Sequence, residues 1–172
     1  MKTWFEPRDI KLLLWEKLNT SREFAVEMAM LAGLPAGVMQ SFCAELLVTS
    51  TRPFCKRDIF FFCTIDGNEC AALLEFCFGE PVESRSCSRS KLLLLERKRP
   101  ERFKKGVCVL LASEEVLASD PEAKRYPEQI KFSDLFRLLE RMTPERSGFY
   151  REVFDNLVPH SCYVSGGTMI LE

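Results

Sequence analysis

Two carboxylates and a thiol lie in neighbouring apolar stretches of this 172-residue chain. Asp58 is the second residue of the stretch RDIFFFCTI, and Glu75 interrupts the run ALLEFC, in which Cys77 follows two positions later. Residues two apart on a strand point to the same face, so Glu75 and Cys77 are expected to share one. Two carboxylates at one end of a sheet could bind a hard cation such as Mg²⁺ through oxygen.

A turn signal separates the two stretches and predicts how they pair. The sequence DGNE, residues 66–69, contains Asp-Gly, which is a favoured hairpin dipeptide. The aromatic, β-rich stretch before it and the apolar stretch after it are therefore predicted to be antiparallel neighbours. Asp58 and Glu75 should then lie on adjacent strands.

Glu75 needs an explanation of its own, because an ionised carboxylate in a buried strand is costly unless it is paired. Three arrangements would explain a carboxylate at this position. The carboxylate could form an internal ion pair with an arginine, it could belong to a working or vestigial metal site, or it could lie on the solvated face of an edge strand.

The remaining elements follow from the apolar periodicity. Helical spacing predicts three helices in the first fifty residues, in RDIKLLLWEKL, REFAVEMAMLA and VMQSFCAELLV, with Thr20 and Ser21 as cap candidates. After the hairpin, SRSCSRSKLLLLERKR is predicted as a helix, VCVLLAS as a strand buried on both faces, and EEVLASDPEAKRYPE as a loop. Then IKFSDLFRLLERM predicts a short strand and a helix capped at Ser133, PERSGFYREVFDNL another helix, and CYVSGGTMIL a final hairpin.

These elements predict an α/β fold with a mixed β-sheet flanked by helices. We expect a single domain over 1–172. It comprises a helical N-terminal part (1–50), a core that holds the candidate site (51–142), and a C-terminal helix and hairpin (143–172).

Composition restricts the compartment and the cofactors. The formal net charge is -1, no apolar run reaches the roughly 18 residues of a membrane helix, and the N-terminus lacks a signal-peptide core. The eight cysteines form no close CxxC pair and mostly lie in apolar runs, so they are expected to be free, buried thiols rather than disulfides or zinc ligands. We therefore predict a soluble, cytoplasmic protein without a membrane partner.

One segment has a strong excess of positive charge. Residues 85–105 hold nine Lys or Arg and two Glu, close in sequence to the candidate site. Such a segment could contact the phosphate backbone of DNA or RNA, or form a solvated helix face. The candidate phosphate contacts are Arg85, Arg89, Lys91, Arg97, Lys98, Arg99, Arg102, Lys104 and Lys105.

The order of these features resembles the PD-(D/E)XK nuclease superfamily. RDI matches its first acidic motif, and EFC occupies the place of ExK. SREFAVEMAMLAGLP looks like the family's leading helix with its acid at Glu23, VCVLLASEE like its following core strand, and YPEQIKFSDLFRLLERM like its closing strand and helix. The resemblance covers roughly residues 21–142 and implies a restriction-endonuclease-like core.

For an active member, the resemblance implies Mg²⁺ held by Asp58 and Glu75. The motif lysine is replaced by Cys77, a shorter side chain that is a soft ligand and carries no ammonium. Lys91 is the candidate for a lysine supplied from elsewhere. Three hypotheses follow: an impaired member that binds nucleic acid or regulates, an active Mg²⁺-dependent nuclease using Asp58, Glu75 and Lys91, or a protein-interaction domain that needs no cofactor.

Overall fold

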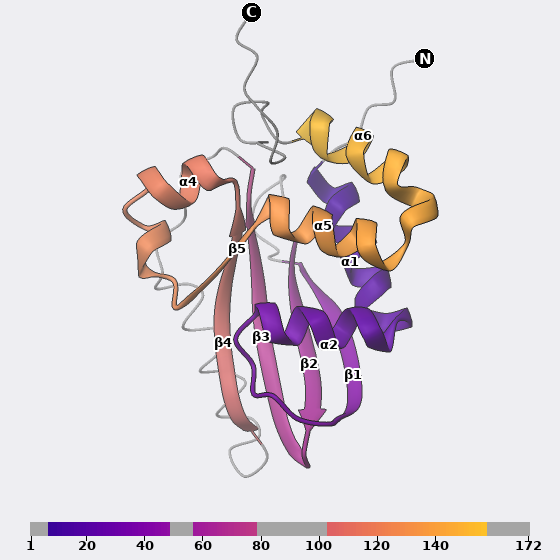
Figure 1. The fold of residues 1–172 in the computed structure, drawn as a ribbon. Helices are drawn as coiled ribbons and strands as arrows, with labels where there is room; N and C mark the ends of the chain where they lie inside the picture. Colours follow the sequence, from indigo (N-terminus) through magenta and orange to yellow (C-terminus); the bar gives the residue numbers. More distant parts are fainter. Residues whose placement is uncertain (1–6, 49–56, 79–102, 158–172) are drawn as a thin grey trace, which may run out of the picture.

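The computed structural model describes residues 7–48, 57–78 and 103–157 (Figure 1). Its elements, in chain order, are α1 (Pro7–Thr20), α2 (Arg22–Leu31), β1 (Met39–Val48), β2 (Arg57–Ile65), β3 (Asn68–Cys77), β4 (Phe103–Ala112), α4 (Glu114–Ser119), η1 (Ala123–Arg125), β5 (Glu128–Lys131), α5 (Phe132–Met142), η2 (Pro144–Arg146) and α6 (Ser147–Leu157).

The described strands form one five-stranded mixed sheet in the order β1-β2-β3-β4-β5. Strands β1, β2 and β3 are antiparallel neighbours, whereas β4 runs parallel to β3 and β5 runs parallel to β4. The carboxyl ends of β3, β4 and β5 therefore meet the start of β2 at one end of the sheet. The predicted α/β class and mixed sheet are confirmed.

The hairpin between β2 and β3 forms at the predicted Asp-Gly turn. Asp66 has φ 48° and Gly67 has φ 77°, which is the pair of positive φ values that a type I′ turn requires. The Asp66 side chain also accepts a hydrogen bond from the Val38 backbone N–H at 2.9 Å. The turn therefore fixes the β2–β3 register and fastens it to the start of β1.

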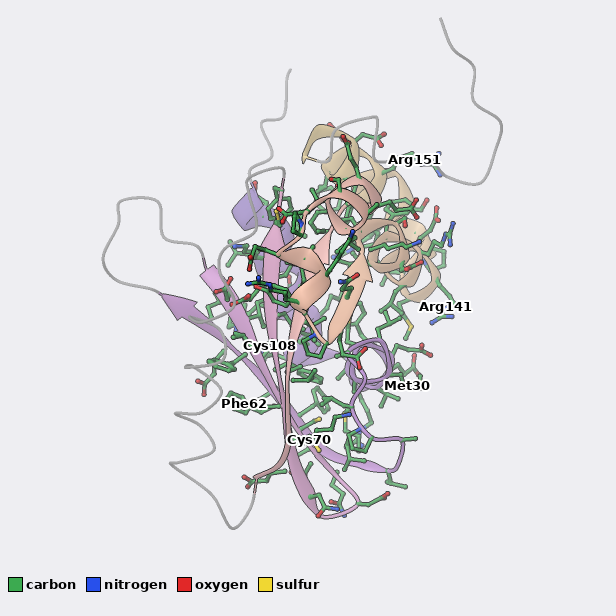
Figure 2. All side chains as sticks on the ribbon, turned by 90° about the vertical axis from the view of Figure 1, so that its left-hand side faces the viewer. Met30, Phe62, Cys70, Cys108, Arg141 and Arg151 are labelled. Carbon is green, nitrogen blue, oxygen red and sulfur yellow. The ribbon has the colours of Figure 1, made fainter. Side chains whose placement is uncertain are left out.

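Two apolar layers lie on opposite faces of the sheet. One face packs against α1, α2, α5 and α6 through residues such as Leu14, Phe24 and Leu135. The other face packs against α4, η1 and the turn after it, where Val116 and Tyr126 contact the sheet. Figure 2 shows Phe62 and Cys108 on this second face, away from Met30 and Arg141 on the helical side. The site is built on the second face.

Helix α2 has both of its ends fixed by hydrogen bonds. The Ser21 side chain accepts a bond from the Phe24 N–H at 3.2 Å, so the predicted cap at Ser21 is confirmed. At the other end, Gly33 has φ 70°, its N–H bonds to Met30 O, and the Leu34 N–H bonds to Ala29 O. These two bonds and the left-handed glycine form a Schellman motif.

The prediction of a third N-terminal helix is wrong, because residues 39–48 form strand β1. Phe42, Ala44 and Leu46 alternate into the helical face of the sheet, as strand residues do. A register shift between Met39 and Ser41 adds one residue. The core-facing residues Met39, Phe42 and Leu46 are therefore spaced by three and four, which is also the spacing of an amphipathic helix.

Other predictions were partly right. Residues 114–128 were predicted as a loop, but Ser113 accepts a hydrogen bond from the Val116 N–H and begins helix α4. Helix α5 begins at Phe132 after Lys131, so Ser133 is not its cap. The helix after Pro144 and the buried strand over Val107–Ala112 are confirmed. The predicted helix ending at Arg99 and the hairpin over 162–171 lie outside the described residues.

Candidate functional site

Asp58 and Glu75 lie on one face at one end of the sheet, as predicted. The register places Ile59 opposite Leu74, so Asp58 and Glu75 are the next facing positions of the same antiparallel pair. Facing residues of an antiparallel pair share a face. Asp58 is buried, with 6% of its surface exposed, and Glu75 is half-buried. Since β3 lies between β2 and β4, the edge-strand explanation of Glu75 is wrong.

Cys77 shares this face with Glu75 but belongs to its apolar part. Its exposed fraction is 7%, and it clusters with Leu73, Leu110 and Ala112. The position that would hold the lysine of an ExK motif is therefore a packed, buried position. A thiol fits among these neighbours, whereas an ammonium would have to lose much of its hydration there.

Tyr126 donates a hydrogen bond from its hydroxyl to the Glu75 carboxylate. The tyrosine follows η1, and its ring is buried against the second face of the sheet with 5% of its surface exposed. Glu75 and Tyr126 are 51 residues apart. The carboxylate thus has a neutral hydroxyl donor, a partner that was not predicted from the sequence.

Nothing local in the sequence identifies Tyr126 as part of the site. It stands in a stretch that was predicted as a loop, and only the parallel pairing of β4 with β3 and of β5 with β4 brings that stretch to the end of β3. One weak signal exists: an aromatic residue with a polar tip, Tyr126, precedes Pro127 and a strand, and buried tyrosine hydroxyls usually find a partner.

We expect Tyr126→Phe to lower the free energy of unfolding by about 1.5–3 kcal/mol, the range for a hydrogen bond to a charged group. Urea unfolding of Tyr126→Phe, Glu75→Gln and the double variant would give the coupling energy of the pair. The matched control is Tyr150→Phe, which removes a buried hydroxyl that bonds to Thr143 Oγ1 at 2.6 Å. Full additivity of Tyr126→Phe with Glu75→Gln would contradict the expectation.

Glu23 does not join the carboxylate pair. It lies in the first turn of α2 with an exposed side chain, and α2 packs on the helical face of the sheet through Phe24 and Met28. Asp58 and Glu75 point to the opposite face. The acid of the leading helix is therefore separated from them by the sheet itself.

The basic residues that were predicted to bind phosphate lie mostly outside the described residues, as does Lys91. Lys105 is described: it pairs with Cys70 near the start of β4, at the opposite end of that strand from Ala112. Its ammonium donates to the Gly33 carbonyl oxygen, on the helical side. Lys105 is therefore distant from the carboxylate pair and fastens the end of α2.

The described residues do not make a complete Mg²⁺ site. Within 7–48, 57–78 and 103–157, no group of three or more His, Cys, Asp or Glu side chains is arranged to hold a metal ion. Mg²⁺ takes oxygen ligands in octahedral geometry, and the third residue of this constellation is the soft thiol of Cys77. Two carboxylates remain, one of which is hydrogen-bonded to Tyr126.

Five cysteines lie in the described part of the chain, and none of them forms a disulfide there: Cys43, Cys63, Cys70, Cys77 and Cys108. The pKa of the Cys63 thiol is raised to about 12, mainly by burial and to a lesser degree by the neighbouring Cys70 and Cys43. Burial also raises the pKa of Cys70, against the opposing charge of Lys105. These thiols stay protonated at neutral pH, which makes them poor nucleophiles and poor metal ligands.

Comparison with known protein families, with characterised proteins and with solved structures found no match to this chain. Among the described helices, none combines the length and apolar character needed to cross a membrane.

Proposed function

We propose that this chain is a divergent PD-(D/E)XK nuclease-like domain with impaired phosphodiester cleavage, and that it acts in the cytoplasm as a nucleic-acid-binding or regulatory module. One observation carries the proposal. Asp58, Glu75 and Cys77 share one face at the end of a β2–β3 hairpin, and Cys77, in the lysine position, is buried.

The order of elements supports the resemblance to that superfamily. Helix α2 occupies the place of the leading helix, β2 and β3 carry the two acids, β4 is the buried core strand, and β5 enters α5 as the closing segment. Strand β4 lies parallel beside β3, with Glu75 opposite Leu110. A restriction-endonuclease-like core remains part of the proposal.

Cleavage is expected to be impaired because the site lacks the cation of its motif. Removing one preorganised charge-stabilising group typically costs about 10²–10³-fold in kcat. Cys77 cannot orient an attacking water or offset phosphate charge as an ammonium would. The Tyr126 hydroxyl, in contact with Glu75, further favours a structural use of that carboxylate.

The test measures cleavage and binding on the same DNA and RNA oligonucleotides. In Mg²⁺ or Mn²⁺ we expect little or no cleavage, together with binding that weakens steeply as salt rises, which is the behaviour of phosphate contacts. Robust cleavage by the wild type that is lost in Asp58→Asn and in Glu75→Gln would overturn the proposal that cleavage is impaired. If Lys91→Ala also abolished cleavage, the hypothesis of an active nuclease that uses Lys91 would replace the proposal.

Binding has a matched pair of variants. Arg97→Ala/Lys98→Ala/Arg99→Ala should weaken binding and reduce its salt dependence. Arg137→Ala/Arg141→Ala/Arg151→Ala removes the same number of charges from exposed positions on α5 and α6 and should leave binding unchanged. Wild-type protein that binds no nucleic acid at low salt would instead favour the protein-interaction domain.

A further inference from the structure

The outer edge of β1 is covered by side chains of helix α1. In the described sheet β1 is an edge strand, paired only with β2. The Ala44 N–H donates to Asn19 Oδ1 at 3.0 Å, and Asn19 Nδ2 donates to Ala44 O at 3.1 Å. Trp15 Nε1 donates to the same carbonyl oxygen at 2.9 Å. Figure 1 shows α1 beside this strand.

The Asn19 amide imitates one residue of a neighbouring strand. A side-chain amide has the same donor and acceptor as a peptide group, and here it takes both backbone groups of Ala44, as a facing residue in a hydrogen-bonded antiparallel pair does. Its Nδ2 also donates to the Trp15 carbonyl at 2.9 Å, which holds it in place. Arg22 donates to the Met39 carbonyl further along β1.

We propose that α1 blocks strand addition at the outer edge of β1, and that the strand it excludes is β1 of a second copy of this chain. Unpaired edge groups are a template for pairing with another chain. Antiparallel pairing of two β1 strands about a two-fold axis would place Ala44 opposite Ala44, using the two groups that Asn19 now occupies.

The side chains of β1 are compatible with such a pairing. Gln40, Ser41, Cys43 and Glu45 are exposed, so they are available to contact the side chains of an added strand. In the register centred on Ala44, Cys43 of one copy faces Glu45 of the other, and no like charges stand directly opposite one another. The Asn19 and Trp15 hydrogen bonds, on a helix that is anchored in the core by Leu14 and Leu18, occupy the two groups of Ala44 that this pairing would use.

The test measures the self-association of the Trp15→Phe/Asn19→Ala variant by sedimentation velocity over a range of protein concentrations. The double variant keeps an aromatic ring at position 15 but removes the described side-chain groups that bond to Ala44. We expect its dimerisation constant to tighten at least about tenfold relative to wild type, because the arriving strand has fewer hydrogen bonds to displace. Hydrogen exchange should slow at the β1 amides as the dimer forms.

Two further variants make the result decisive. Asn19→Asp keeps the acceptor for the Ala44 N–H and removes the donor, so it should associate to an intermediate degree, and it replaces the double variant if that variant does not fold. Ser147→Ala removes a hydrogen bond to Glu140 between α5 and α6 and should stay as monomeric as wild type. A folded Asn19 variant that stays monomeric, or associates without protecting β1, would overturn the proposal.

Discussion

Cys108→Lys is expected to lower the free energy of unfolding by about 3–5 kcal/mol, the range for an uncompensated buried charge, and Cys77→Lys by clearly less. The two thiols are matched: they are 6% and 7% exposed and lie in the same apolar cluster on the same face. They differ in their place relative to the acid pair. Cys77 lies two residues from Glu75 and diagonally across from Asp58 at the sheet end, whereas Cys108 faces Leu73 and is diagonal to Glu75 alone.

The difference is expected because a lysine at 77 has both carboxylates, Asp58 and Glu75, as same-face neighbours. A buried lysine without a partner has a pKa below its unfolded value, so the unfolded chain binds more protons and stability rises with pH through that window. A neighbouring carboxylate favours the ammonium and should reduce this pH dependence in Cys77→Lys. Urea unfolding at pH 7 and pH 9 measures both effects.

An equal decrease in the free energy of unfolding in the two variants would mean that the acid pair does not stabilise an ammonium at position 77. The same Cys77→Lys protein also serves as a nuclease test in Mg²⁺. Cleavage gained in Cys77→Lys and absent in Cys108→Lys would support the ancestry proposed for the site. The comparison with Cys108→Lys separates that gain from general effects of a buried lysine.

Gly33→Ala is expected to cost about 1–2 kcal/mol, slightly more than Gly67→Ala at about 1 kcal/mol, because both glycines have positive φ but only at Gly33 must a side chain move aside. A left-handed conformation alone costs an L-residue roughly 1–2 kcal/mol. Gly33 has φ 70° and Gly67 has φ 77°, so the same conformational cost applies at both positions. An added Cβ at Gly67 would meet no atom within 4 Å, whereas one at Gly33 would overlap the Glu128 carboxylate, which is the end of a flexible side chain and must move aside.

Denaturant unfolding of both variants measures the difference, and Glu128→Ala identifies its source. In the Gly33→Ala/Glu128→Ala protein the loss beyond Glu128→Ala should fall toward that of Gly67→Ala, because the overlapping group has been removed. A loss that stays unchanged in the Glu128→Ala background would show that the backbone conformation alone sets the cost at Gly33.

The part of the fold that could be predicted from sequence is the part encoded by local chemistry. Asp66-Gly67 requires positive φ at two adjacent residues, and this fixed the hairpin and hence the facing of Asp58 and Glu75. Ser21 likewise identified the start of α2. Strand β1 could not be recognised, because one extra residue near Gln40 converts a strand alternation into helical spacing.

The candidate site was predictable only within its hairpin. Glu75 and Cys77 follow from a period of two, but Tyr126 reaches Glu75 through two successive parallel pairings that leave no local trace. The separation of Glu23 from the pair has a similar cause. Periodicity shows that α2 has an apolar face but does not show which side of the sheet that face covers.

The strand order has a consequence for the route by which the chain folds. Strands β1, β2 and β3 follow one another as neighbours, so their pairing closes short loops, whereas β3 and β4 are joined in parallel across the stretch from Cys77 to Phe103. Closing a longer loop costs more entropy, and non-local parallel pairing is slow. The antiparallel half should therefore become structured first. Because Tyr126 follows β4, its bond to Glu75 belongs to the late phase of folding.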